Sequence, residues 1–335
     1  MTNGFAPPRK ILAVMDESAA QTALLNAAAL AERYGANLEV FGCVEPPHDL
    51  DVIARLSKQE PDQLLERLCA EKEKRMAAWI STHLPHHRIT PQIKVGKAFI
   101  EIIRHVIHEN CDFVVKQAEP LSGINRLLFT STDQHLLRKC PCPVWMQPAN
   151  TPREAKRVIA AVDVDLADAA EPDTLMSLNR RVIQTACTVA AQEGAQVVGL
   201  HAWDAIGEGL IWAFSSDTNS RVTADNYVNE VLNDRHQAMR RLLEAVEADL
   251  SGDSHPALVP RLIRGTPENV IHEQSRDIAA DVVVMGTVAR TGLRGVFIGN
   301  TAENIINTLE CPVLAVKPDG FISPLDARFA TNLEA

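Results

Sequence analysis

The sequence lacks three features that would place it in other classes of protein. No apolar run approaches the roughly 18 residues that cross a bilayer, and residues 1–10 lack the apolar core of a secretory signal. Positive charge is in deficit, since 33 Lys and Arg face 43 Asp and Glu, for a net charge of -10. We therefore expect a cytoplasmic protein without a membrane span, whose main partner is neither nucleic acid nor an anionic membrane.

The cysteines do not form the pattern of a disulfide framework. Their number, seven, is odd, and most lie in apolar segments, which favours reduced core thiols. Two clusters could suggest a metal site: Cys140-Pro141-Cys142, and His105, His108 and Cys111 at intervals of three. We expect neither to bind a metal, because one intervening proline is not a usual zinc spacing and Cys111 lies at a helix end.

The chain contains an internal repeat. A shift of 169 (265 minus 96) aligns residues 96–148 with residues 265–317 without a gap, with ten identical pairs in 53 positions. Ordinary composition would give about three. With other offsets, residues 10–16 align with 157–163 and residues 35–38 with 194–197. A length of 335 residues suits two domains, which we place at 1–150 and 151–335.

Each copy alternates apolar strands with helices. The expected strands of the first copy are 10–15, 37–44, 89–95, one beginning at Asp112, and 144–147; those of the second are 157–162, 196–203, 258–263, one beginning at Asp281, and 313–317. The clearest helices are expected at 23–34, 61–83, 179–193 and 224–250. Near-continuous apolar strands separated by helices predict parallel sheets covered on both faces. The fold class is therefore α/β, with two tandem, doubly wound, five-stranded parallel sheets.

A glycine-containing loop follows the fourth strand of the second copy. Four apolar residues precede Gly286, Ala289 follows, and Gly299-Asn300-Thr301 begins a helix, with Asn300 and Glu303 spaced as an N-cap and its partner. Free amides at such a helix start suit a phosphate. The alternative is a tight turn that uses glycine only for geometry.

The first strand of the second copy ends at Asp163. In a doubly wound sheet ligands bind at the carboxyl ends of the strands, so Asp163 and Gly286 are expected at one edge. The alternative for Asp163 is an ordinary helix cap.

These features together resemble the universal stress protein family. The order of features in the second copy matches that of the family: a strand ending in Asp163, then His201, Gly265-Thr266-Pro267, Gly286-x-x-Ala289 and Gly299-Asn300. The resemblance covers nearly the whole chain, in two copies. The resemblance implies a tandem two-domain member. A Gly-x-x-Gly-x9-Gly-Ser/Thr loop marks the family's ATP-binding branch, and here Ala289 replaces the second glycine and Asn300 the hydroxyl residue.

The resemblance also implies roles for individual residues. Asp163 would contact the ribose or adenine, and Ala202 would lie against the base with its backbone. The phosphates would be cradled by Met285, Gly286, Ala289, Gly299, Asn300 and Thr301. ATP in a pocket with few cations usually requires Mg²⁺.

The first copy departs from this loop. Gln117, Pro120, Thr130 and Ser131 stand at the positions of Gly286, Ala289, Gly299 and Asn300, and Glu119 adds negative charge. We expect Ser131 with Gln134 to keep the helix cap, and we predict that this domain does not bind ATP.

The family also implies how the copies associate, because its single-domain members pair through the last strand. Residues 144–146 and 313–315 would then pair within one chain as an intramolecular pseudo-dimer, and further association into a homodimer is left open. We expect the tail after Pro318, with Phe321, Leu325 and Phe329, to pack back on the body.

The expected function is ATP binding by a stress-response protein that signals or protects. Arg290 and Arg294 are the loop's cations, and neither is positioned by sequence, so we expect at most weak hydrolysis. The alternative is a scaffold for a partly apolar ligand or a protein partner, for which Trp203, Trp212 and Phe214 would supply aromatic surface.

Overall fold

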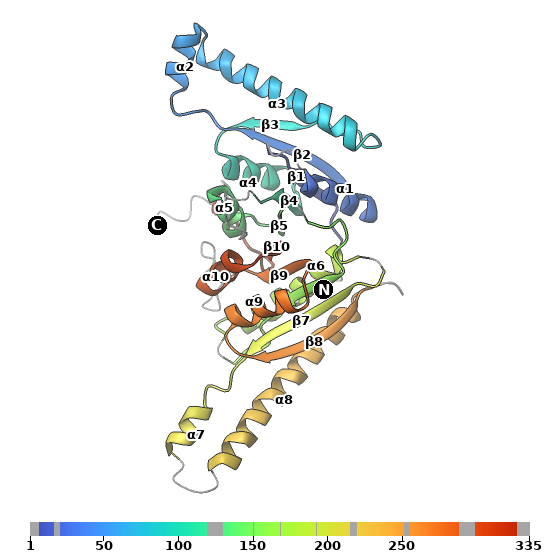
Figure 1. Cartoon of the computed structure of the whole chain (residues 1–335), viewed down its shortest axis with the longest axis vertical. Coiled ribbons are helices and arrows are strands. Elements are labelled where there is room, and N and C mark those ends of the chain that lie inside the picture. The colour runs from blue at the N-terminus through green and yellow to red at the C-terminus, as the bar shows by residue number, and fades with distance from the viewer. Residues whose placement is uncertain are drawn as a thin grey trace. The chain divides into compact units, whose positions relative to one another are not determined.

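The computed structural model describes residues 7–16, 21–118, 130–149, 151–167, 169–191, 193–214, 220–250, 255–287 and 299–326. The chain divides into two compact α/β units, coloured from blue to red along the chain in Figure 1. The N-terminal unit contains residues 7–153 and also takes in residues 310–326. The C-terminal unit contains residues 154–287 and 299–309.

The N-terminal unit is a sheet in the order β3-β2-β1-β4-β5, with all four neighbouring pairs parallel. Its strands are β1 (Lys10–Val14), β2 (Asn37–Val44), β3 (Gln92–Val95), β4 (Phe113–Gln117) and β5 (Val144–Gln147). Its helices are α1 (Thr22–Tyr34), α2 (Leu50–Ser57), α3 (Pro61–His83), α4 (Ala98–Glu109) and α5 (Ser131–Lys139). Strands β1 and β4 lie inside the sheet, so nearly all of their residues are buried, as the apolar runs predicted.

Strand β10 (Val313–Val316) completes this unit from the far end of the sequence. It pairs antiparallel with β5, with Val313 opposite Met146, Leu314 opposite Trp145 and Ala315 opposite Val144. The predicted pairing of residues 144–146 with 313–315 is therefore confirmed. The tail follows β10, and the Lys317 ammonium lies 5.2 Å from the centre of the Phe321 ring; Phe329 lies outside the described residues.

The C-terminal unit repeats the parallel arrangement in the order β9-β6-β7-β8. Its strands are β6 (Arg157–Ala161), β7 (Gln196–Trp203), β8 (Ala257–Arg264) and β9 (Val282–Gly286). Its helices are α6 (Pro172–Val189), α7 (Glu208–Phe214), α8 (Ser220–Glu247), α9 (Pro267–Asp277) and α10 (Asn300–Thr308). Among the described residues of both units, no helix is both long and apolar enough to cross a membrane.

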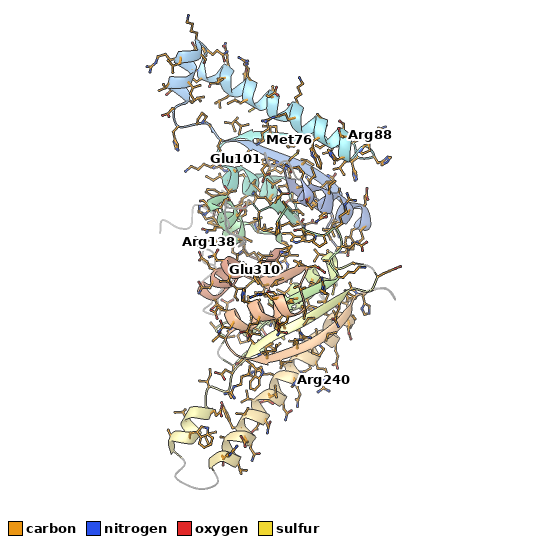
Figure 2. The ribbon with its side chains drawn as sticks, in the orientation of Figure 1. Met76, Arg88, Glu101, Arg138, Arg240 and Glu310 are labelled. Atoms are coloured by element: carbon orange, nitrogen blue, oxygen red, sulfur yellow. The ribbon has the colours of Figure 1, made fainter. Side chains whose placement is uncertain are left out.

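The long helices α3 and α8 cover one side of their sheets and insert a methionine each. Met76 lies on the side of α3 that faces the strands (Figure 2) and is 3% exposed. A Cβ atom on Gly42 of β2 would lie 2.8 Å from the Met76 sulfur, so glycine makes room for the methionine there. In the other unit Met239 of α8 is fully buried, and its sulfur would lie 3.3 Å from a Cβ on Gly199.

Several predicted helix ends are wrong. Helix α6 begins at Pro172 rather than residue 179, because proline suits a first helical turn. It ends at Val189 rather than residue 193, and Gly194, with φ 66°, lies in the turn beyond the helix. Helix α1 ends at Tyr34, as predicted, and Gly35 follows as its C-cap with φ 64°.

The predicted N-caps are wrong by one residue in both copies. Helix α10 begins at Asn300, and Gly299 is its N-cap without a side-chain hydrogen bond. In the first copy Thr130, not Ser131, is the cap: its side chain accepts from the Asp133 amide, and the Asp133 carboxylate accepts from the Thr130 amide. The residue before each expected cap has the non-helical backbone of an N-cap, with ψ 166° at Thr130 and 140° at Gly299.

Candidate functional site

The carboxyl ends of β6 and β9 bring the predicted residues to one edge of the C-terminal unit. These two strands are neighbours, with Ala161 opposite Met285, so Asp163 and Gly286 both follow directly at the same edge. Ala202, near the end of the adjacent strand β7, is half-buried. The sequence therefore placed Asp163, Ala202, Met285 and Gly286 at or near the ends of neighbouring strands, as a doubly wound sheet requires.

The backbone of Asp163 is held by a buried asparagine of α6. The Asn179 Oδ1 atom accepts from the Asp163 amide at 3.0 Å, and its Nδ2 donates to the Asp163 carbonyl at 2.6 Å. The carboxylate accepts from the Asp165 amide at 3.2 Å and is 32% exposed. Because α6 begins only at Pro172, Asp163 is not the cap of that helix. Its carboxylate remains accessible at the sheet edge.

A buried histidine lies beside this carboxylate. The Nδ1 atom of His201 donates to the Val162 carbonyl at 3.2 Å and lies 3.8 Å from Asp163 Oδ1. Burial lowers the pKa of His201, which opposes the raising effect of Asp163, and the ring is therefore neutral at pH 7. Its Nε2 atom is buried, with no hydrogen-bond partner among the described residues.

Gly286 has a packing role of its own. A Cβ atom there would lie 2.7 Å from Leu178 Cδ2 of α6, so the glycine gives this leucine room against the end of β9. Met285 is 4% exposed and Thr287 is fully buried. A close approach of backbone to side chain is thus one physical reason for glycine at this position.

The remaining predicted positions are at or near the start of α10. Gly299 is half-buried and Thr301 is exposed, and the Gly299 carbonyl accepts from the Glu303 amide at 3.0 Å. The amides of the first turn ahead of Glu303 lack an acceptor within the helix. Asn300 begins the helix, whereas Ala289, Arg290 and Arg294 lie outside the described residues.

The equivalent edge of the N-terminal unit is filled by a buried ion pair. Lys116, at the position of Met285, places its ammonium 2.9 Å from Asp133 Oδ1 and 3.7 Å from Asp16 Oδ2. Asp133, at the position of Ala302, is fully buried and also belongs to the capping box of α5. Gln117, at the position of Gly286, is 1% exposed. Glu119 and Pro120, which we expected to matter here, lie outside the described residues.

Sequence reasoning missed Lys116 and Asp133. Both are visible in the repeat alignment, where an ionisable residue of the first copy faces Met285 or Ala302 of the second.

Comparison with known proteins identifies the family. The universal stress protein family matches residues 8–148 and again residues 156–317. The chain belongs to this family of stress-response proteins, in two tandem copies.

Relatives of the same tandem length support the assignment. Universal stress protein E of Salmonella typhi is 30% identical over 315 residues, which cover 91% of this chain and 93% of that protein. Universal stress protein E of Escherichia coli strain K12 is 29% identical over 91% and 92%. A crystal structure of a functionally unknown protein from Pseudomonas aeruginosa PAO1 superposes with a TM-score of 0.63 at 24% identity, covering 95% of each chain. A universal stress protein from Archaeoglobus fulgidus gives a TM-score of 0.55 at 18% identity, covering 92% of this chain and 98% of that one.

Within this family fold, the three aromatic residues singled out from the sequence do not share one environment. Trp203 ends β7 and is buried, with the Arg264 guanidinium 5.9 Å from its ring centre. Trp212 of α7 is 50% exposed, whereas the side chain of Phe214 lies outside the described residues. Trp203 therefore belongs to the core, and Trp212 to the surface.

Proposed function

We propose that this stress protein binds ATP or another adenine nucleotide at the carboxyl edge of the C-terminal unit, and not in the N-terminal unit. The observation that carries the proposal is the contrast at equivalent positions. Lys116, Gln117 and Asp133 are buried at the N-terminal edge, where Lys116 and Asp133 form an ion pair, whereas the equivalent residues Met285, Gly286 and Ala302 carry no charge. Each copy has an aspartate after its first strand, Asp16 in the first and Asp163 in the second.

The accessible carboxylate and the helix start suit different parts of a nucleotide. Asp163 can accept hydrogen bonds from ribose hydroxyls, since it is held in place by Asn179 while its carboxylate faces solvent. Free amides at the start of α10 favour phosphate oxygens. Arg235 is engaged with Asp165 at 2.7 Å, so Mg²⁺ would be the counter-ion for the phosphates.

The nucleotide would act as a signal or a stabilising ligand. Among the described residues at this edge, His201 is buried and neutral and Arg235 is paired, so neither is placed as a base or a phosphate clamp. The proposed role is therefore that of a nucleotide-dependent signalling or protective factor rather than an efficient ATPase.

Calorimetric titration of the full chain with Mg²⁺-ATP tests the proposal. We expect one equivalent to bind. Asp163→Asn is expected to weaken binding by about tenfold, on the order of the 1.5 kcal/mol of a hydrogen bond to a charged group. Asp16→Asn is the matched control in the N-terminal unit and should leave the affinity unchanged.

A double variant that transfers the ion pair of the N-terminal unit to the C-terminal unit provides a second test. Met285→Lys combined with Ala302→Asp recreates the Lys116–Asp133 pair and should abolish binding while the unit stays folded, as circular dichroism would show. If ATP binds both the Asp163→Asn and the transplant variants with wild-type affinity, or if two equivalents bind the wild type, the proposed site is wrong.

A scaffold function has one specific observation in its favour. Four large apolar side chains on or beside α7 and at the start of α8 are exposed: Ile206 (82%), Leu210 (62%), Trp212 (50%) and Val222 (59%). Exposed apolar groups of this kind often mark binding surfaces. Native mass spectrometry of the purified protein separates the two functions, because co-purified nucleotide supports the first and a co-purified apolar ligand supports the second.

A further inference from the structure

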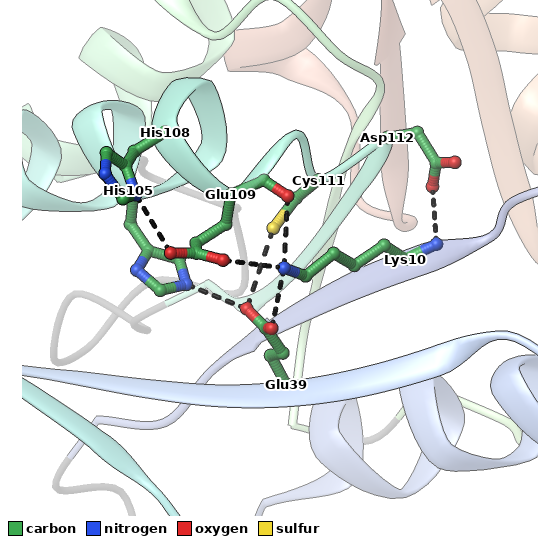
Figure 3. Close-up of polar contacts among 7 residues, drawn as sticks. All are labelled: Lys10, Glu39, His105, His108, Glu109, Cys111 and Asp112. Carbon is green, nitrogen blue, oxygen red and sulfur yellow. Dashed lines mark hydrogen bonds and ion pairs between the residues drawn. The ribbon is translucent and has the colours of Figure 1, made fainter.

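We propose that Glu39, His105 and Cys111 of the N-terminal unit form a binding site for one Zn²⁺ or a chemically similar divalent ion. Glu39 belongs to β2, His105 to α4, and Cys111 to the short connection between α4 and β4 (Figure 3). Their donor atoms all lie within 4.8 Å of one another. The nucleotide site proposed above lies at the carboxyl ends of the strands of the C-terminal unit and shares no residue with this cluster, so the two sites are independent.

The separations of the three donors suit a small tetrahedral ion. Glu39 Oε2 lies 2.9 Å from His105 Nε2 and 3.9 Å from Cys111 Sγ. Zinc bonds of about 2.0–2.3 Å in tetrahedral directions require donors roughly 3.3–3.6 Å apart, which small side-chain rotations would give. Nitrogen, oxygen and sulfur donors in one site match the preferences of zinc. Three protein ligands would leave a fourth position for water.

The three side chains are held before any ion binds. The His105 ring packs on Phe41, with ring centres 4.7 Å apart, and this contact directs Nε2 toward Glu39. Cys111 is 5% exposed, while Glu39 is 21% exposed, so the cluster meets solvent on the side of the carboxylate. His108, which the sequence spacing had grouped with His105, instead contacts Glu109 at 2.9 Å.

The second repeat shows that the fold does not need this cluster. The strand register places Val198 at the position of Glu39, and the shift of 169 places Gln274 and Ala280 at those of His105 and Cys111. By contrast, Asp112 and Asp281 both accept from the two amides at the start of the first strand of their unit. The shared aspartates serve the fold, and the unshared donors need another explanation.

The ion pair between Lys10 and Glu39 does not prevent Glu39 from binding a metal ion. Lys10 contacts Glu39 Oε1 at 2.8 Å, on the oxygen that does not face His105, and it also donates to Glu109 Oε2 and to the Glu109 carbonyl, both at 3.0 Å. It therefore keeps two acceptors when Glu39 binds an ion. Burial, with the Glu39 charge, raises the pKa of Cys111 to about 12. Binding then converts the thiol to a metal-bound thiolate and releases its proton to solvent.

Titration of the reduced, tag-free full chain with Co²⁺, the spectroscopic substitute for Zn²⁺, tests the site. We expect one equivalent to give an intense near-ultraviolet thiolate-to-cobalt charge-transfer band, and Zn²⁺ to displace it. Three variants copy the second repeat and should fold: Glu39→Val, His105→Gln and Cys111→Ala. Cys111→Ala should lose the band, and the other two should weaken binding at least tenfold.

Matched cysteine controls locate the signal. Cys69→Ser, on α3, and Cys142→Ser, in the buried Cys140 and Cys142 pair, should keep the band and the affinity. The proposal is wrong if the folded wild type binds no Co²⁺ at micromolar concentrations, or if the band survives in Cys111→Ala and disappears in Cys142→Ser.

Discussion

Removal of either partner of the Lys116–Asp133 pair should destabilise the N-terminal unit far more than removal of both. The two charged groups are 2.9 Å apart, with side chains 4% and 0% exposed. Removing one partner leaves the other charge buried and unpaired, which lowers the free energy of unfolding by about 3–5 kcal/mol. Asp133→Ala also removes the capping-box acceptor of the Thr130 amide, which adds about 1 kcal/mol, for a total near 4–6 kcal/mol.

The second repeat supplies the double variant. Met285 and Ala302 occupy these positions in the C-terminal unit, so Lys116→Met with Asp133→Ala replaces the pair by residues that the fold already accepts. The double variant should lose only the cap, about 1 kcal/mol. It should thus be more stable than Asp133→Ala alone, with a coupling energy of at least about 2 kcal/mol between the two sites.

Urea unfolding followed by tryptophan fluorescence measures this cycle. Trp79 and Trp145 lie in the N-terminal unit and Trp203 and Trp212 in the C-terminal unit, so a background with Trp203→Phe and Trp212→Phe reports the N-terminal unit alone. If the losses of unfolding free energy in the two single variants sum to the loss in the double variant within about 0.5 kcal/mol, the two buried charges are not energetically coupled and the reasoning is wrong.

Three further predictions concern charge and backbone. Lys10→Met should tighten Co²⁺ binding about tenfold in a competition titration, because it removes a positive charge roughly 5 Å from the ion; weaker binding would contradict this. Burial lowers the pKa of Lys317 to about 7 against about 10.4 when unfolded, so the native state binds fewer protons between these values. The free energy of unfolding should therefore rise with pH from 7 to 10, by at most about 1.4 kcal/mol per unit, and Lys317→Met should flatten this slope in urea melts at pH 7, 8 and 9. Gly35→Ala should cost about 1 kcal/mol because φ is 64° with open space around the added methyl, whereas Gly209→Ala in α7 should not destabilise; equal effects would contradict the backbone explanation.

The repeat made much of the fold predictable. Apolar runs in two aligned copies predicted every strand described in the structure, and family resemblance predicted the pairing of β5 with β10. The helix caps were harder. Asn300 and Ser131 have good capping propensities, but Gly299 and Thr130 have the non-helical backbone of an N-cap. Side-chain propensity alone cannot decide between two adjacent residues when the backbone conformation selects the other one.

Residues of a candidate site could be grouped from the sequence only where the order of the strands brings them together. Asp163 and Gly286 follow neighbouring strands, so their common edge follows from topology. Glu39 lies 66 residues from His105 and has no spacing relation to it, and the cluster exists only because β2 packs under α4. The spacing of His105 and His108 was visible in the sequence, but His108 turned out to face Glu109.

The two copies separate residues that serve the fold from residues that do something else. Asp112 and Asp281 make the same pair of backbone contacts in both units, so selection for the fold alone explains them. Lys116, Asp133, Glu39 and Cys111 have apolar counterparts in the second copy, where the same sheet forms without them. Lys116, Asp133 and Cys111 are buried and Glu39 is half-buried. Buried polar groups cost free energy unless they are fully satisfied, so the presence of these residues in one copy only is not explained by stability. In the N-terminal unit a buried ion pair lies at the carboxyl ends of the strands, and three side chains with metal-ligand chemistry lie together beside β2 and α4, whereas in the C-terminal unit the Asp163 side chain is 32% exposed.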